Sequence, residues 1–394
     1  MKKQWNAIFL LAGTAIGSGM LSLPIVLSHV GVLYTCLLMG LFAAVSYFSA
    51  IIRVELNLQS NCEYTLEDVG LAFSGKIAAL VGSVCLKILS LALLAAYTYG
   101  LSAMAPISNT VVTAAIGIGI FLLLVFSSER IVNSNRTLFI FLLLAVLLAI
   151  VHMLISVDFN GLPTVAHDIR PAKVCVVLPT LFTSFGFQGS LHSLTKFCGD
   201  DVRMLKRSCL WGSVIPAIVY LSWTFCVMAI VFNHQPELFT RMTRSGVDVG
   251  ELITALGAAA DAVFVKRAVV VISTLAIVTS VVGVGVALVE DLEMAFDRWE
   301  IPLVRGRRRR VLASLLAVMP SVFVAIVVPE AFIKTLGFAG MILAVLAIFL
   351  PSFLLLKIAK PLKIEILSRR SIVCATVAVG VLLVVCEMVS IFGS

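Results

Sequence analysis

The sequence is poor in charged residues. Asp, Glu, Lys and Arg make up only 13% of its 394 residues, against roughly 25% in soluble domains. Because 61% of the residues are apolar and the mean hydropathy is +1.11, this scarcity predicts an integral membrane protein. The net charge of +8 does not indicate a nucleic-acid partner, because the basic residues lie in short loops between apolar runs.

The chain also lacks the motifs that other classes of membrane protein need. Its nine cysteines form no C-x-x-C pair, which argues against a disulfide framework or a metal site. No G-x-x-x-x-G-K-[ST] motif is present, so transport driven by ATP would require a separate subunit. A membrane-embedded enzyme would need clustered acids, paired histidines or metal ligands at membrane depth, and the first ten apolar runs contain no Asp or Glu. We therefore expect no cofactor, no metal and no enzymatic activity.

Apolar runs long enough to cross a bilayer, which takes about 20 residues, recur along the chain. We predict eleven spans, of which the fourth and ninth are short: 6–29, 31–52, 77–104, 111–127, 137–156, 174–197, 209–232, 268–289, 311–328, 332–356 and 371–391. Lys2 and Lys3 resemble the start of a signal peptide. The first run is too long for one and no cleavage site ends it, so we expect it to be retained.

The basic residues indicate one orientation in the membrane. Most of the 29 Lys and Arg residues lie in segments that share a side with the N-terminus, including the run Arg305–Arg310. The positive-inside rule then places the N-terminus in the cytoplasm and, after an odd number of spans, the C-terminus in the periplasm of a bacterial inner membrane. A nucleic-acid patch is the alternative interpretation of the arginine run. Two further helices are predicted outside the spans, one in 57–75 with a start signal at Thr65 and one over Val249–Ala262.

Two of the spans are interrupted by residues that disfavour a helix. Gly13, Gly17, Gly19 and Pro24 lie in the first run, where each glycine costs about 1 kcal/mol and proline about 3 kcal/mol relative to alanine. The stretch 178–192, five spans later, again holds glycines and small hydroxyl residues. Broken helices at corresponding places in two halves predict an inverted-repeat transporter with its binding site at the breaks.

The spacing of the breaks also predicts the domain organisation. We expect a single transmembrane domain in which residues 1–156 form the first repeat and 174–356 the second, with 371–391 as an additional eleventh helix. Because each repeat has five spans, an odd number, the two halves lie in opposite orientations, as this symmetry requires.

The sequences at these two breaks resemble motifs of a known family. The stretches GTAIGSGMLSLP at 13–24 and LPTLFTSFGFQGS at 178–190 are similar to the two broken-helix motifs of the hydroxy and aromatic amino acid permeases, and most like those of the tyrosine-specific transport proteins. Further agreement comes from AAY at 95–97, TSVVG at 279–283 and LGFAG at 336–340. The resemblance covers nearly the whole chain. It implies an all-α protein with the LeuT-type fold of the amino acid–polyamine–cation superfamily, which takes up an aromatic amino acid, most of all tyrosine, with the proton gradient.

The chain departs from the family at the second break. Gln188 stands where the family usually has a histidine, and the usual proline that follows is replaced near His192. Gln188 can reach a phenolic hydroxyl as a neutral donor and acceptor. His192 is either the titrating group for the proton, since only histidine changes charge near neutral pH unperturbed, or a polar cap.

An amino acid brings a carboxylate, an ammonium and a side chain, and opened helix ends can bind the first two. The predicted carboxylate site is the backbone of Gly17, Ser18 and Gly19. The predicted ammonium site comprises the carbonyls of Ala15 and Phe182 with the hydroxyls of Thr183 and Ser184. Phe185 and Phe187 are candidates for stacking on an aromatic ring. The alternative is that the glycines only allow close helix packing and the aromatic residues face lipid or a neighbouring helix.

Other candidates lie in the third and eighth spans. Tyr97 resembles the superfamily tyrosine whose hydroxyl helps to bind the substrate carboxylate, and Tyr99 lies about 200° away around the helix, so only one of them lines the site. Thr279 and Ser280 match the place where sodium-coupled relatives bind a cation together with carbonyls, here those of Gly13 and Ile16. The alternative is that both hydroxyls bond carbonyls of their own helix.

Lys87 and Glu387 are charged residues that lie within predicted spans. Lys87 is costly at membrane depth, and it is a cation substitute linked to the proton, a partner for Glu55, or a side chain that extends to the interface. Glu387 lies outside the repeats and is interpreted as structural. The leading hypothesis is therefore a secondary amino acid symporter in the lipid bilayer. The alternatives are a sodium-coupled or exchange-type transporter of tryptophan, phenylalanine or another neutral amino acid, and a channel or sensor on the same scaffold.

Overall fold

A computed structural model describes residues 2–60, 66–105, 107, 110–126, 129–166, 171–244, 247–259, 263–298, 307–328, 330–358, 362–364 and 370–392. Within these ranges all regular secondary structure is helical. Thr65 and Arg305, singled out in the sequence, lie outside the described residues.

The first half of the chain runs from α1 to α7. Its elements are α1 (Lys2–Ala15), the 3₁₀ turn η1 (Ser18–Leu21), α2 (Leu23–Leu27), α3 (Val32–Gln59), α4 (Leu66–Ser74), α5 (Lys76–Ala103), α6 (Thr110–Val125) and α7 (Glu129–Ser156). The second half has α8 (Pro171–Ser184), η2 (Gln188–Ser190), α9 (Leu191–Cys198), α10 (Val202–His234), α11 (Pro236–Arg244), α12 (Val249–Ala259), α13 (Val263–Arg298), α14 (Arg307–Val327), α15 (Ala331–Ala344), the π-helical turn η3 (Val345–Phe349), α16 (Leu350–Leu356) and α17 (Arg370–Phe392).

The described residues contain nine helical segments long and apolar enough to cross a membrane. Each coincides with one of the predicted spans, and the predicted short helices are present as α4 and α12. The two remaining predicted spans are the first, which is divided into α1, η1 and α2, and the fourth, α6, which has only 16 residues. The predicted interruptions of the first and sixth spans are confirmed, and the protein is a multi-pass membrane protein.

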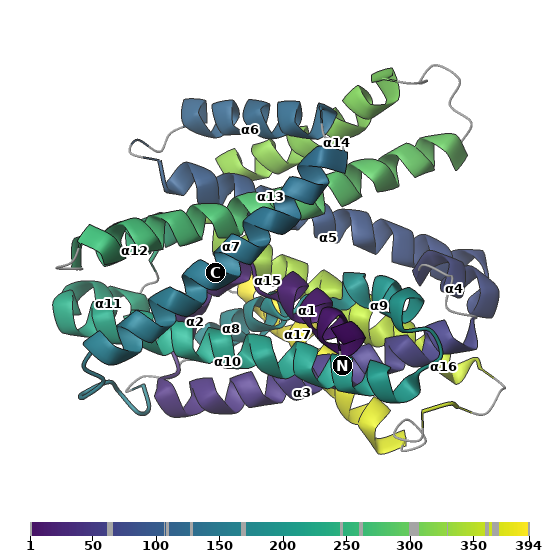
Figure 1. The fold of residues 1–394 in the computed structure, drawn as a ribbon, viewed down its shortest axis with the longest axis horizontal. Coiled ribbons are helices and arrows are strands. Elements are labelled where there is room, and N and C mark those ends of the chain that lie inside the picture. Colours follow the sequence, from purple (N-terminus) through teal and green to yellow (C-terminus); the bar gives the residue numbers. More distant parts are fainter. Residues whose placement is uncertain are drawn as a thin grey trace.

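The helices form two groups with α15 between them (Figure 1). In one group α1 packs on α10 and α10 on α3; in the other α13 packs on α7 and α5, and α14 on α5 and α6. Helix α15 contacts α5 on one side and α8 on the other. The two interrupted helices belong to the first group, and η1 also contacts α13 of the second. The breaks therefore lie where the two groups meet.

The connection between α10 and α13 is a helical cover. Gly250 of α12 lies against α5 so closely that a Cβ atom would be 2.2 Å from the carbonyl oxygen of Ala103. At the other end, Lys173 of α8 donates to the carbonyls of Thr243, at 2.6 Å, and Arg244. A cation at these carbonyls stabilises α11, because it offsets the partial negative charge at the C-terminus of the helix. The cover is thus fastened to both helix groups.

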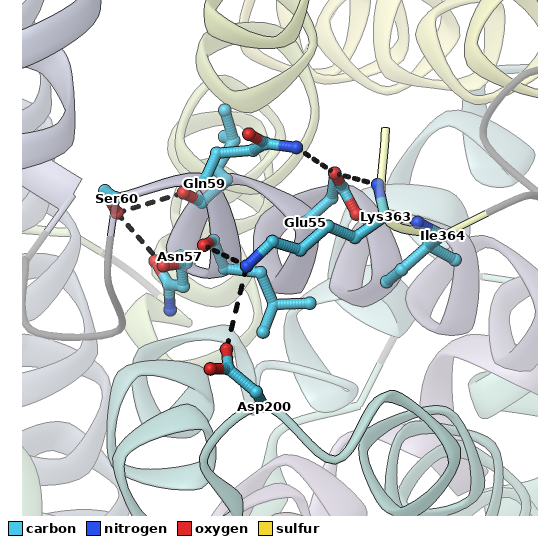
Figure 2. Close-up of polar contacts among 9 residues, drawn as sticks. Glu55, Asn57, Gln59, Ser60, Asp200, Lys363 and Ile364 are labelled. Atoms are coloured by element: carbon cyan, nitrogen blue, oxygen red, sulfur yellow. Dashed lines mark hydrogen bonds and ion pairs between the residues drawn. The ribbon is translucent and has the colours of Figure 1, made fainter. Parts of the chain in front are cut away.

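A buried carboxylate at the end of α3 holds the segment that follows α16 (Figure 2). Glu55 is fully buried and accepts hydrogen bonds from the backbone amides of Lys363 (2.8 Å) and Ile364 (3.0 Å) and from Gln59 Nε2 (2.7 Å). Three donors compensate for the loss of water around the charge. Lys363 Nζ lies 3.7 Å from Asp200 and 3.1 Å from the carbonyl oxygen of Leu58.

This arrangement corrects one interpretation of Lys87. Glu55 is engaged with residues 363 and 364 and is not the partner of Lys87. Lys87 instead donates to Ser83 Oγ at 2.8 Å and forms an ion pair with Asp291 of α13 at 3.8 Å. The pair joins α5 to α13 within their membrane-spanning segments. Sequence spacing could not reveal it, because Asp291 lies beyond the apolar run that predicted the eighth span.

Candidate functional site at the two broken helices

The first break exposes backbone donors. Helix α1 ends at Ala15, and Gly17 is extended (φ −157°, ψ −151°) before η1 begins at Ser18. The Gly19 amide has no acceptor among the described residues, whereas the Gly17 amide is directed at the Tyr220 phenolic oxygen and the Ser18 amide lies 3.4 Å from Ser280 Oγ. An unpaired N–H group near the start of a helical turn, next to two amides that donate only to side-chain hydroxyls, is a suitable place for a carboxylate.

The glycines of this break are also required by contacts. A Cβ atom on Gly17 would be 3.0 Å from Ser280 Oγ, and one on Gly19 would be 2.8 Å from Ser184 Oγ. Gly13 faces Phe139 of α7, where a Cβ atom would be 2.8 Å from the ring. Close approach to α13, α8 and α7 therefore accounts for all three glycines, as the packing alternative holds. It is compatible with a ligand site because the Gly19 amide stays unpaired among the described residues.

The second break follows α8 directly. Phe185, Gly186 and Phe187 lie outside regular helix between Ser184 and η2, with short turn bonds such as Gly186 N to the Thr183 carbonyl oxygen at 2.9 Å. Ser184 and Gly19 are in contact across the two breaks. The structure thus brings the two predicted halves of the site together, from positions more than 160 residues apart.

Tyr220 of α10 joins the two breaks, and the sequence did not single it out. Its hydroxyl lies 2.5 Å from the carbonyl oxygen of Ala15 and 2.7 Å from that of Ser184, the last residues of α1 and α8. Its ring meets Phe185 edge-on, with ring centroids 5.6 Å apart. The only signal in the sequence was a tyrosine inside an apolar span, where a buried phenol needs a hydrogen-bond partner.

A second tyrosine completes the polar group. Tyr97 is buried, and its phenol approaches the hydroxyls of Ser18 and Ser280. Tyr99 points elsewhere, toward Asp248 before α12, as the helical repeat predicts. Burial raises the pKa of the Asp248 carboxyl above its ordinary value, and hydrogen bonds from backbone amides and from Tyr99 oppose this shift.

The candidate hydroxyls differ in where they point. Thr183 Oγ1 donates toward the carbonyl oxygen of Leu336 at 2.7 Å and so faces α15. Ser184 Oγ bonds the Thr180 carbonyl oxygen at 3.1 Å but touches Gly19. Thr279 and Ser280 both bond carbonyls of their own helix, at 2.8 Å to Leu275 and 2.7 Å to Ala276. Of these four hydroxyls in the described part of the chain, those of Ser184 and Ser280 contact the first break.

The aromatic candidates divide between two clusters. Phe185 and Phe187 are both fully buried, but Phe185 packs with the large core around Phe182 and Tyr220, and Phe187 with a separate cluster that includes Leu11 and Leu191. Phe182 packs on Phe42 of α3, with centroids 6.1 Å apart.

Two polar side chains of the second break each have a buried atom without a hydrogen-bond partner in the described part of the chain. Gln188 Nε2 lies 3.4 Å from Ser49 Oγ, and its Oε1 has no partner among the described residues. His192 Nδ1 is likewise buried without a partner in that part of the chain. Each unpaired buried atom is costly unless a ligand or water completes it.

The LGFAG stretch of α15 also has a structural explanation. A Cβ atom on Gly340 would be 2.2 Å from the Pro179 carbonyl oxygen and 2.7 Å from Thr183 Oγ1. One on Gly337 would be 2.6 Å from a carboxylate oxygen of Glu387, which is buried in α17. These glycines allow α15 to pack closely on both α8 and α17.

Comparison with known proteins identifies the family. Residues 1–392 match the tryptophan/tyrosine permease family. The chain belongs to this family. Tyrosine-specific transport system 1 of Haemophilus influenzae is 31% identical over 366 residues, covering 91% of this chain and 88% of that protein. Glutamine transporter 2 of Aliivibrio fischeri is 23% identical over 368 residues, covering 91% and 90%.

A solved structure shares the fold of the permease. A manganese transporter of Eremococcus coleocola aligns with a TM-score of 0.61 over 98% of this chain and 85% of that one, at 13% sequence identity. At this identity the likeness concerns the fold alone. The protein is accordingly a helical membrane permease, and membership of this family, rather than any missing catalytic residue, assigns it to the transporters.

Proposed function

We propose that the permease imports an aromatic amino acid, with tyrosine as the preferred substrate, by alternating access at the two broken helices. Its family and the name of its Haemophilus influenzae relative support this substrate class. The observation that carries the proposal is the meeting, at one buried point, of backbone amides that the first break releases from the helix and of helix C-terminal carbonyls. An amino acid carries both charges, and helix ends of opposite polarity complement them.

The carboxylate would bind at the first break. The Gly19 amide is free to donate, the Gly17 amide would exchange the Tyr220 oxygen for the carboxylate, and the Tyr97 phenol and Ser18 hydroxyl lie beside them. Ser18 is 1% exposed and its Oγ has no partner of good geometry in the described part of the chain. A carboxylate would satisfy these donors together, and hydrogen bonds to an ionised group are about twice as strong as neutral ones.

The ammonium would bind on the other side of the break. It would donate to the remaining lone pairs of the Ala15 and Phe182 carbonyls and to the Ser184 hydroxyl oxygen. Thr183 faces α15, so we assign it to the contact between α8 and α15.

The aromatic ring would lie along the second break. Phe185 is the better of the two stacking candidates, because it contacts Tyr220 and belongs to the same cluster as Phe182. Gln188, with an unpaired Oε1, would accept a hydrogen bond from the phenolic hydroxyl of a tyrosine substrate. This contact would distinguish tyrosine from phenylalanine, since a buried polar group left unpaired by the wrong substrate is costly.

For the architecture we propose the LeuT-type inverted repeat with eleven crossings. Residues 1–156 and 174–356 would form the two repeats and 371–391 the additional helix. The divided first helix and α6 would be the first and fourth crossings, and they bring the nine long apolar helices of the described residues to eleven. The N-terminus would be cytoplasmic and the C-terminus periplasmic, in a bacterial inner membrane. The basic residues of the loops on the N-terminal side support this orientation.

The proton gradient is the proposed driving force. His192, whose Nδ1 is unpaired, and the ion pair of Lys87 with Asp291 are the candidate proton carriers. The alternative is sodium bound by Thr279 and Ser280 with the Gly13 and Ile16 carbonyls, or exchange without net uptake. The glutamine-transporting relative supports a second candidate function, transport of a different neutral amino acid.

One competition experiment tests these proposals together. Purified permease in proteoliposomes would take up labelled tyrosine against each unlabelled amino acid, with a proton gradient, a sodium gradient or neither. We expect tyrosine, tryptophan and phenylalanine to compete, and collapse of the proton gradient to abolish accumulation. Competition only by glutamine and other non-aromatic amino acids would refute the aromatic assignment. Accumulation that requires a sodium gradient would refute proton coupling.

A further inference from the structure

Two helix ends of the same polarity meet at one buried point. The carbonyl oxygens of Ala15, at the end of α1, and Ser184, at the end of α8, both face the Tyr220 hydroxyl, at 2.5 and 2.7 Å. The C-terminus of an α-helix carries roughly half a negative charge. Two such ends in a low-dielectric interior need a positive or proton-donating partner between them.

The Tyr220 phenol is this partner, and it satisfies only one end at a time. A phenolic hydroxyl has a single proton to donate, whereas two carbonyl oxygens face it. No Lys, Arg or His side chain in the described part of the chain bonds either carbonyl. One acceptor therefore stays available for a second donor, and an ammonium group, which has three protons, can fill that role.

The position of the hydroxyl is set by rigid packing. Tyr220 is fully buried, and its ring lies at 90° to that of Phe185. Helix α10 is packed on α1 so closely that a Cβ atom on Gly212 would be 2.7 Å from Leu11 Cβ. Tyr220 is thus held to α1 along its own helix and to α8 through Phe185 and the Ser184 carbonyl, so it links the two interrupted helices.

We propose that Tyr220 is a positioning residue that takes the place of a coupling cation between the two broken helices. Its hydroxyl offsets the negative helix ends, so the site binds the amino-acid ammonium without a sodium ion at this point. This inference rests on the proposed amino acid transport. Without the hydroxyl, two unpaired carbonyls would face each other and offer a small cation a site of oxygen ligands.

The test is the ion dependence of Tyr220→Phe. Uptake of labelled tyrosine would be measured at a constant proton gradient, with sodium present or replaced by choline. In the variant we expect KM to rise roughly tenfold, the effect of leaving a buried acceptor unpaired, and sodium to lower that KM. The wild-type KM should not respond to sodium. Tyr220→His, which keeps a donor, should stay insensitive to sodium.

Tyr34→Phe is the matched control, because Tyr34 is 41% exposed on α3, and it should keep the wild-type KM. A wild-type KM in Tyr220→Phe, or a raised KM that sodium does not lower, would overturn the inference. Sodium-dependent tyrosine binding by the wild type would overturn it as well, and this measurement holds even where the variants do not fold. If the wild type transported no aromatic amino acid, the proposed function would fail instead.

Discussion

Substituting alanine for Gly19 should slow transport markedly and leave the protein inserted and folded. The added Cβ atom would be 2.8 Å from Ser184 Oγ and 3.1 Å from both Ser184 Cα and Cβ. A rotated hydroxyl relieves only the first contact, so the backbone of α8 must also move away from η1. Overpacking of this kind costs about 1–3 kcal/mol, and because 1.36 kcal/mol is tenfold in rate, initial uptake should fall by about 5- to 150-fold.

The assay is initial uptake of labelled tyrosine at low concentration, normalised to the amount of protein in the membrane. Gly40→Ala is the matched control, since Gly40 also lies in an apolar helix but a Cβ atom there meets nothing within 4 Å. The control should transport like the wild type, because alanine favours a helix by about 1 kcal/mol over glycine. Uptake by Gly19→Ala within a factor of two of the control would refute the role assigned to this contact.

Three further predictions concern other parts of the molecule. Glu55→Gln should lower the thermal unfolding midpoint in detergent, because the charge-assisted bonds from two backbone amides, worth about 1.5–3 kcal/mol each, weaken; an unchanged midpoint would contradict this. Gly250→Val should prevent α12 from packing on α5 and raise protease cleavage in the cover, whereas Gly119→Val, with open space at Cβ, should not. Gln188→His should change the ranking of tyrosine, tryptophan and phenylalanine in competition assays, and an unchanged ranking would mean that residue 188 does not contact the ring.

The membrane spans and both breaks could be predicted because they are local properties. A run of about 20 apolar residues has few alternatives to a membrane helix, and three glycines with a proline disfavour helix at their own position. The short helices α4 and α12 were predictable for the same reason, since start signals and helical spacing lie within one segment. The opposite directions of Tyr97 and Tyr99 follow from the 3.6-residue repeat alone.

Side-chain partners were harder to predict, because they depend on which helices pack together. Lys87 was clearly unusual in the sequence, but its partner Asp291 is about 200 positions away. Thr183 and Ser184 are neighbours with similar hydroxyls, yet one faces α15 and the other touches Gly19. Their directions depend on the rotation of α8 against α15, which Gly340 permits.

The sequence by itself determined that this protein crosses the membrane many times, that two helices are interrupted, and which family the interruptions resemble. Hydropathy and backbone conformational preference are properties of short segments, so they need no knowledge of the packed structure. Only the tertiary structure decided that the two interruptions meet and that Tyr220, 205 residues from Ala15, lies between their carbonyl ends. A hydrogen bond across that separation exists only once α1, α8 and α10 are packed together.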